Sequence, residues 1–180
     1  MNSDLFSDLR TRGRTVFFPP FDNTTAHVES KQIHLVATGE VHIVLESISH
    51  WPDGFTLNMA LFLATATREI PHFVHHPLST APAPDGLNVA VRFPDGRKAT
   101  TLDPLEHGQD TSAMVTLNVT STAGGGETHL RQGIYVHPLP PPGSVVVAVR
   151  WEARGVGETR IELDGTEILA GAARARQVWS

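Results

Sequence analysis

Histidine is the residue type in this chain with the most evident capacity for chemistry, since ten of the 180 residues are histidine. The densest group is His72, His75 and His76. Imidazole is a common metal ligand, and a zinc site needs three or four ligands that converge on one ion. Pro71 and Pro77 bracket the group and oppose a helix, and in an extended strand His75 and His76 would point to opposite faces. We therefore prefer a loop that faces solvent or a partner, and keep a metal site at these three histidines as the alternative.

Other signals for catalysis are weak. The chain has no cysteine, which excludes disulfides, thiol catalysis and cysteine-ligated zinc. The glycine run at 124–126 leads into a predicted strand, whereas a phosphate-binding loop leads into a helix. Glu158, Arg160, Glu162 and Asp164 alternate along a predicted strand, a spacing that acid–base pairs can use but that is more typical of a charged solvent face. We expect no cofactor, and we favour a protein that is not an enzyme.

The charge balance excludes several classes of partner. The formal net charge is −5, and the chain has no cluster of lysine and arginine suited to phosphates, so nucleic-acid binding is disfavoured. No segment approaches the roughly 18 consecutive apolar residues of a membrane span. Residues 1–14 lack the basic and apolar regions of a signal peptide. We therefore expect no membrane contact and a cytoplasmic location.

Alternating apolar residues indicate the elements that must position any site. Runs of period two, separated by Gly and Pro turns, predict about nine strands. They favour an all-β, antiparallel two-sheet sandwich, immunoglobulin-like in architecture. A short helix is possible at 3–12, within an N-terminal arm at 1–30, and residues 31–180 form a single β-sandwich domain that ends in a helix at 166–179. The proline-rich segment 138–142 is expected to bridge the two sheets.

Two hairpins allow the pairing register to be predicted. A three-residue loop at 38–40 would pair Leu35 with Ile43 and Ile33 with Leu45, although a crossover to a second sheet is the alternative. After the turn at 51–54, the prediction pairs Ser49 with Phe55, Leu45 with Met59 and Ile43 with Leu61. His34, His42 and Glu46 then lie on the outer face, which we expect a helix or another subunit to cover.

The candidate binding residues are Trp51, Tyr135 and His137. An aromatic platform for carbohydrate, formed by Trp51, Tyr135 and Trp151, is a weaker idea because Trp151 falls in a register that faces the core.

The C-terminal half of the chain carries a recognisable series of motifs. They are Gly-Gly-Gly at 124–126, Pro-Leu-Pro-Pro-Pro-Gly at 138–143, Trp151, Gly155, Glu158-Thr159-Arg160 and Asp164. Together with Phe-Pro-Asp-Gly-Arg at 93–97, they resemble an uncharacterised family of small bacterial proteins. Between the glycine run and the proline connector, the chain has Tyr135 as its only aromatic ring besides histidine, fewer than that family has. The resemblance implies no catalytic residue.

Two hypotheses about function follow. The first is a non-enzymatic β-sandwich that acts by contact with a protein partner or with itself, for instance as a homodimer, through a strand edge or an outer sheet face. The second is a His-dependent metal-binding enzyme or small-ligand binder that uses the loop at 68–86.

Overall fold

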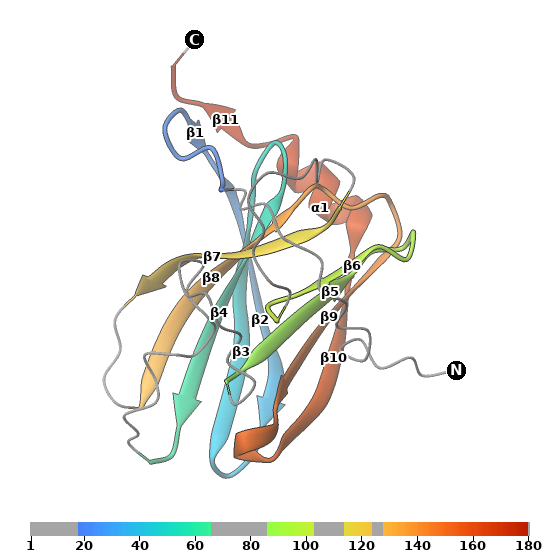
Figure 1. Ribbon diagram of the computed structural model, residues 1–180. Helices are drawn as coiled ribbons and strands as arrows, with labels where there is room; N and C mark the ends of the chain where they lie inside the picture. Colours follow the sequence, from blue (N-terminus) through green and yellow to red (C-terminus); the bar gives the residue numbers. More distant parts are fainter. Residues whose placement is uncertain (1–17, 66–85, 103–113, 124–127, 180) are drawn as a thin grey trace.

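The computed structural model describes residues 18–65, 86–102, 114–123 and 128–179, with no side-chain detail for 121–123. The predicted helix at 3–12 lies outside these residues, as do His72, His75 and His76. The described chain forms an all-β, antiparallel two-sheet sandwich with one short α-helix, which confirms the predicted fold class (Figure 1).

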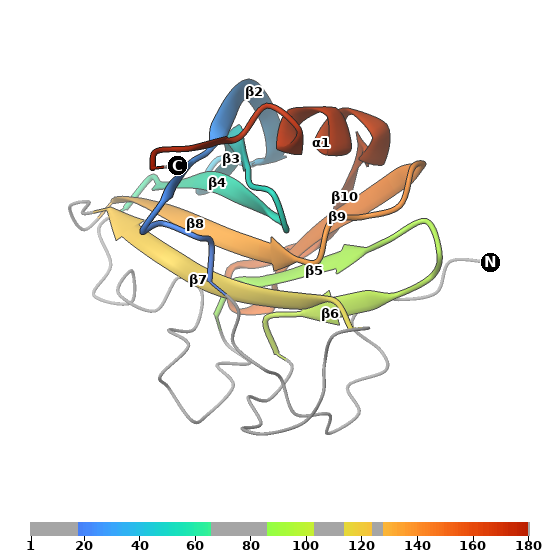
Figure 2. The same ribbon diagram turned by 90° about the horizontal axis from the view of Figure 1, so that it is seen from above.

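Two large sheets make up the sandwich. One has five strands in the order β2-β3-β4-β8-β7, and the other has four in the order β10-β9-β5-β6 (Figure 2). The five-stranded sheet contains β2 (His27–Ala37), β3 (Val41–His50), β4 (Phe55–Leu63), β8 (His129–His137) and β7 (Thr116–Ala123). The four-stranded sheet contains β10 (Val156–Asp164), β9 (Ser144–Trp151), β5 (Asn88–Arg92) and β6 (Lys98–Thr100). Residues 138–143 run from β8 to β9 and so bridge the sheets, as predicted.

Three small elements complete the described fold. A short 3-10 helix, η2 (Glu152–Arg154), joins β9 to β10. Helix α1 (Gly165–Ala172) follows β10, and its first turn is capped by the Asp164 carboxylate, which accepts a hydrogen bond from the Thr166 N–H at 2.7 Å. Beyond it, β11 (Arg176–Gln177) pairs with β1 (Thr24–Thr25) as a two-stranded sheet at the α1 end of the sandwich (Figure 1).

The core lies between the inward faces of the two large sheets. In β4, Phe55, Leu57, Met59 and Leu61 are at most 1 % exposed, and the valines at 145, 147 and 149 of β9 are equally buried. Every second residue of a strand faces the same side, so the alternating apolar pattern places one face of each sheet in contact with the other sheet. The predicted buried strand faces are therefore confirmed.

The hairpin of β2 and β3 is confirmed, but half of its predicted register is wrong. Ile33 lies opposite Leu45 as expected, whereas Ile43 lies opposite Val36 rather than Leu35. A β-bulge after His34 inserts one extra residue, so the neighbouring Leu35 and Val36 are both buried.

A second bulge changes the hairpin of β3 and β4 at one end. Leu45 pairs with Met59 and Ile43 pairs with Leu61 as predicted. Between Leu45 and Ser47 the register shifts by one, so Phe55 lies opposite His50 instead of Ser49. The shift turns His50 toward the interior, where it is 1 % exposed.

The C-terminal helix is shorter than the predicted 166–179. It ends at Ala172, and the N–H groups of Arg174 and Ala175 bond to the carbonyls three residues before them, as in a tightened final turn. Residues 176–177 then pair with β1. The chain thus pairs with a distant strand instead of continuing as a helix. Trp179 is therefore exposed to solvent and does not lie on the apolar face of the predicted helix.

The turn between β3 and β4 gives a test of the packing. A Cβ at Gly54 would lie 2.4 Å from the Val136 carbonyl oxygen and 2.6 Å from the Tyr135 hydroxyl, while a Cβ at Gly39 would meet nothing within 4 Å. Gly54→Ala should lower the free energy of unfolding by about 1–3 kcal/mol, because the added methyl overpacks a filled site. Gly39→Ala, the matched control, should change it by no more than about 0.5 kcal/mol in urea unfolding. Equal effects of the two substitutions would contradict this packing.

Candidate interaction surface

Four large apolar side chains within a few residues of β1 or β11 are exposed. Phe18 is 54 % exposed, Phe21 56 %, Val178 49 % and Trp179 73 %. The Val178 N–H donates to the Asn23 carbonyl at 2.7 Å, which extends the β1–β11 pairing toward these side chains from both segments. We call Phe18, Phe21, Val178 and Trp179 the terminal patch. Large aromatic side chains at the surface suit contact with a protein partner.

Trp51 anchors this patch to the sandwich. Its indole N–H donates to the Thr56 hydroxyl at 3.0 Å, and its ring meets the ring of Phe21 edge-to-face at 5.2 Å. The indole itself is 7 % exposed. Trp51 therefore packs against Phe21 from the interior of the protein, and of these two rings that of Phe21 is the one accessible to solvent.

Tyr135 and His137 lie on β8, and Tyr135 is fully buried. Its hydroxyl donates to an Asp53 carboxylate oxygen at 2.8 Å, and its ring centre is 6.4 Å from that of His137. Burial, together with this hydrogen bond, raises the pKa of Tyr135 well above its ordinary value. The structure thus brings Trp51 and Tyr135 to the two sides of Thr56, which lies opposite Tyr135 in the β4–β8 register. Their assignment to a binding site stays a prediction.

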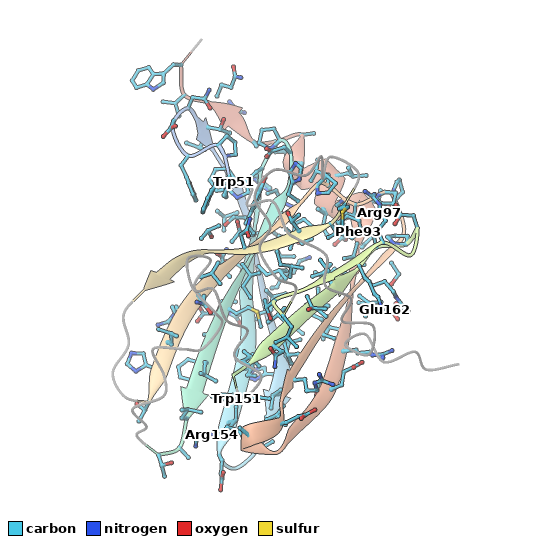
Figure 3. The ribbon with its side chains drawn as sticks, viewed as in Figure 1. Trp51, Phe93, Arg97, Trp151, Arg154 and Glu162 are labelled. Atoms are coloured by element: carbon cyan, nitrogen blue, oxygen red, sulfur yellow. The ribbon has the colours of Figure 1, made fainter. Side chains whose placement is uncertain are left out.

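Trp151 belongs to the other end of the sandwich (Figure 3). It is 4 % exposed, and the guanidinium of Arg154 lies over its ring at 5.6 Å. Trp51, Tyr135 and Trp151 therefore form no shared aromatic platform, in agreement with the core-facing register predicted for Trp151.

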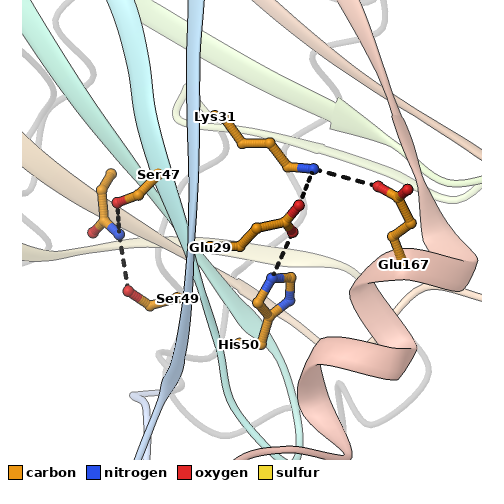
Figure 4. A network of polar contacts seen from close by, with 7 residues as sticks. Glu29, Lys31, Ser47, Ser49, His50 and Glu167 are labelled. Atoms are coloured by element: carbon orange, nitrogen blue, oxygen red, sulfur yellow. Dashed lines mark hydrogen bonds and ion pairs between the residues drawn. The ribbon is translucent and has the colours of Figure 1, made fainter.

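A polar network that starts at the buried His50 and ends at the exposed Glu167 connects helix α1 to the edge of the five-stranded sheet (Figure 4). His50 Nε2 lies 3.3 Å from one carboxylate oxygen of Glu29, and Lys31 Nζ lies 2.6 Å from the other. The same Lys31 ammonium is 3.3 Å from Glu167 on α1. A Cβ at Gly171 would approach the His50 ring to 2.5 Å, so the helix backbone packs directly on the imidazole. The network fixes α1, and the chain runs from α1 into β11.

The ionisation of these groups follows from their surroundings. The hydrogen bond from Lys31 is the main cause that lowers the pKa of Glu29. Burial acts to lower the pKa of Lys31, but hydrogen bonds to Glu29 and Glu167 outweigh it and raise that pKa. For His50, burial dominates and lowers the pKa, in spite of the opposing contact with Glu29. The pairing of cation and carboxylates is thus strongest near neutral pH.

The histidines of the described residues do not converge on a metal position. Within residues 18–65, 86–102, 114–123 and 128–179, no group of three or more His, Asp or Glu side chains could hold an ion. His34 and His42 lie exposed on the outer face of the five-stranded sheet, and α1 packs instead at the end of that sheet, against His50. Helix α1 therefore does not cover this face; the predicted helix at 3–12 lies outside the described residues, and coverage by another subunit stays a prediction. The candidate ligands His72, His75 and His76 lie outside the described part of the chain.

The four-stranded sheet carries a shallow groove. Its volume is about 510 Å³, and it is lined by Arg92, Phe93, Pro94, Gly96, Ser144, Val146 and Glu162. It lies widely open to solvent, and Ser144 donates its hydroxyl to Glu162 at 2.8 Å. Pockets that bind small molecules enclose most of the ligand, which an open groove of this kind does not.

Sequence reasoning identified Trp51 but missed the terminal patch itself. Phe18 and Phe21 fall in the predicted N-terminal arm, in an apolar segment whose Pro19 and Pro20 indicate an edge strand or extended arm. Trp179 fitted the apolar stripe of the predicted helix. These residues belong to segments near opposite ends of the sequence. The pairing of β1 with β11 brings the two segments together.

Comparison of the chain with protein-family models, with curated proteins and with solved structures gives no match. No helix among the described residues has the length and apolar character needed to cross a membrane.

The burial of His50 predicts a stability that falls in acid. Because the folded pKa of His50 is below the unfolded value of about 6.5, the unfolded chain binds more protons as the pH drops through that range. Stabilisation is complete above this pH and declines below it, and the lowered pKa of Glu29 adds a further loss below about pH 4.5. Urea unfolding at pH 7.5 and 5.5 should show the fall.

His50→Gln should flatten this pH dependence, even if the variant is less stable at every pH. Part of the slope will remain, because burial lowers the pKa of His137 as well. An identical slope in the variant and the natural chain would contradict the assignment of the acid sensitivity to His50.

Proposed function

We propose that the chain is a non-enzymatic β-sandwich that acts by protein contact, and that the terminal patch is its contact surface. The observation that carries this proposal is the exposure of Trp179 and Phe21, 73 % and 56 %, at a backbone-paired end of the sandwich. Tryptophan and other aromatic residues are enriched among the side chains that dominate binding energy at interfaces. Exposed rings of this size lose apolar hydration when a partner covers them.

The patch is held in position before any partner binds. Phe21 rests on Trp51, and the turn preceding β1 is closed by hydrogen bonds from Phe21 N–H to the Pro19 carbonyl and from Thr24 N–H to the Pro20 carbonyl. A preformed surface loses less conformational entropy on binding than a loose segment would. The arrangement therefore suits docking of a folded partner.

Charged residues surround the apolar centre. Arg174 and Arg176 are exposed beside β11, and Asp22 is exposed in the turn before β1. An apolar core with a charged, solvent-accessible rim is the usual composition of a protein interface. Because positively and negatively charged side chains both lie here, we expect the partner's surface to carry charges of both signs as well.

The alternative proposal, a metal-dependent enzyme or ligand binder, rests on the sequence of the 68–86 loop alone. Cytoplasmic location and bacterial origin likewise stay proposals that the composition and the motif resemblance support.

Site-specific photo-cross-linking tests the contact surface without knowledge of the partner. A photoreactive phenylalanine analogue placed at Trp179 or at Phe21 should give protein adducts in cells that produce the chain, because both side chains would lie inside the interface. The matched control is Phe62, which is 40 % exposed on β4, outside the terminal patch. Adduct yield at positions 179 and 21 should exceed that at 62 several-fold.

Adducts in equal yield at all three positions would show non-specific encounters and would overturn the proposed surface. The absence of adducts at 179 and 21 would overturn it as well.

A further inference from the structure

We infer that the terminal patch binds a second copy of this chain, and that the two copies join by pairing β11 with β11 across a twofold axis at Gln177. The inference rests on the proposed function, since it names the partner of the same surface. It is carried by three features of the β1–β11 sheet: an open edge, a self-complementary order of side chains, and the small size of the sheet alone.

The open edge belongs to β11. Val178 donates to Asn23, so in an antiparallel ladder the next pair, Thr24 and Gln177, must direct its N–H and C=O groups away from each other. On the β1 side, the Thr24 N–H donates a hydrogen bond to the Pro20 carbonyl at 3.1 Å. On the β11 side, the outward N–H and C=O of Gln177 face a strand position that no described strand fills.

The side chains around Gln177 fit their own copy. A twofold axis at this residue places Gln177 opposite Gln177 and Arg176 opposite Val178. No arginine then faces an arginine, so the pairing avoids the cost of like charges directly across a ladder.

The small size of the two-stranded β1–β11 sheet favours the addition of further strands. Two-stranded sheets are marginal in water, and three or more strands with an apolar face are needed for independent stability. Joining two copies converts two pairs of strands into one four-stranded sheet, β1-β11-β11-β1, and places Val178 of each copy beside Arg176 of the other. A twofold contact closes on itself, so it gives a dimer rather than a fibre.

The long edges of the sandwich are poorer candidates for this pairing. β2 carries two register shifts and a left-handed residue, Gln32, at φ 54°. β10 has a shift between Val156 and Thr159, and β7 has one between Val119 and Ser121. Bulges of this kind protect sheet edges from adding further strands.

A cysteine introduced at the axis tests the geometry directly, because the natural chain has none. Gln177→Cys should give a disulfide-linked dimer of twice 19.5 kDa under mild oxidation at dilute concentration, since paired Cα atoms lie about 5.5 Å apart in such a ladder, within disulfide range. Thr25→Cys is the matched control, because this exposed residue of β1 lies away from the axis. It should cross-link many times more slowly.

Gln177→Pro provides the second arm. It removes only an outward N–H, so the β1–β11 bonds can remain while the twofold bonds are lost. Sedimentation should show concentration-dependent dimers for the natural chain and monomers for the variant, with circular dichroism unchanged. Should the variant fail to fold, the cross-linking arm decides alone.

Equal cross-linking rates for Gln177→Cys and Thr25→Cys, or a natural chain that stays monomeric at all concentrations, would overturn the twofold pairing. Photo-adducts at Trp179 with a different protein, combined with a monomeric chain, would leave the proposed contact surface standing and remove only the second copy as its partner.

Discussion

Burial of one side-chain face from each large sheet is the constraint on which the rest of the structure depends. The inward residues of β4 and β9 are almost completely excluded from water, and a one-residue slip of β4 would put Thr56 and Asn58 in the place of its inward apolar residues. Register can therefore change only where a bulge absorbs an extra residue. The shift between Leu45 and Ser47 does this, and it directs His50 inward beneath α1.

The position of α1 and of the β1–β11 sheet follows from that bulge in β3. His50 contacts Glu29, the Glu29 carboxylate binds Lys31, and Lys31 reaches Glu167 on the helix. These contacts fix α1 close to the end of β3, so that the chain beyond α1 returns along β1. Each charged member of the network has an opposite charge within reach, which offsets the cost of partial burial. A surface of apolar side chains is thereby placed on a rigid support.

The sequence was sufficient for the parts of the fold that depend on local alternation. The strands, the buried face of β4 and the pairs Leu45–Met59 and Ile43–Leu61 could all be predicted from period-two patterns and turn residues. The bulges could not, because an extra residue in a strand has no signature in apolar spacing when both neighbours, such as Leu35 and Val36, are apolar. The terminal patch was also beyond prediction, since Trp179 fits a helical stripe as well as a strand. Long-range pairing with β1 decides between them.

The backbone amide of Gln177 gives the most direct test of the central claim, that this protein makes a protein contact through β11. In the free chain its N–H points away from β1, at an edge of the sheet that no described strand fills, whereas in the proposed dimer it donates across the twofold axis. Amide exchange measured by NMR at increasing protein concentration should show growing protection at Gln177, while the amide of Gly157, an exposed residue of β10, stays unchanged. Fast exchange at Gln177 at every concentration would contradict the account.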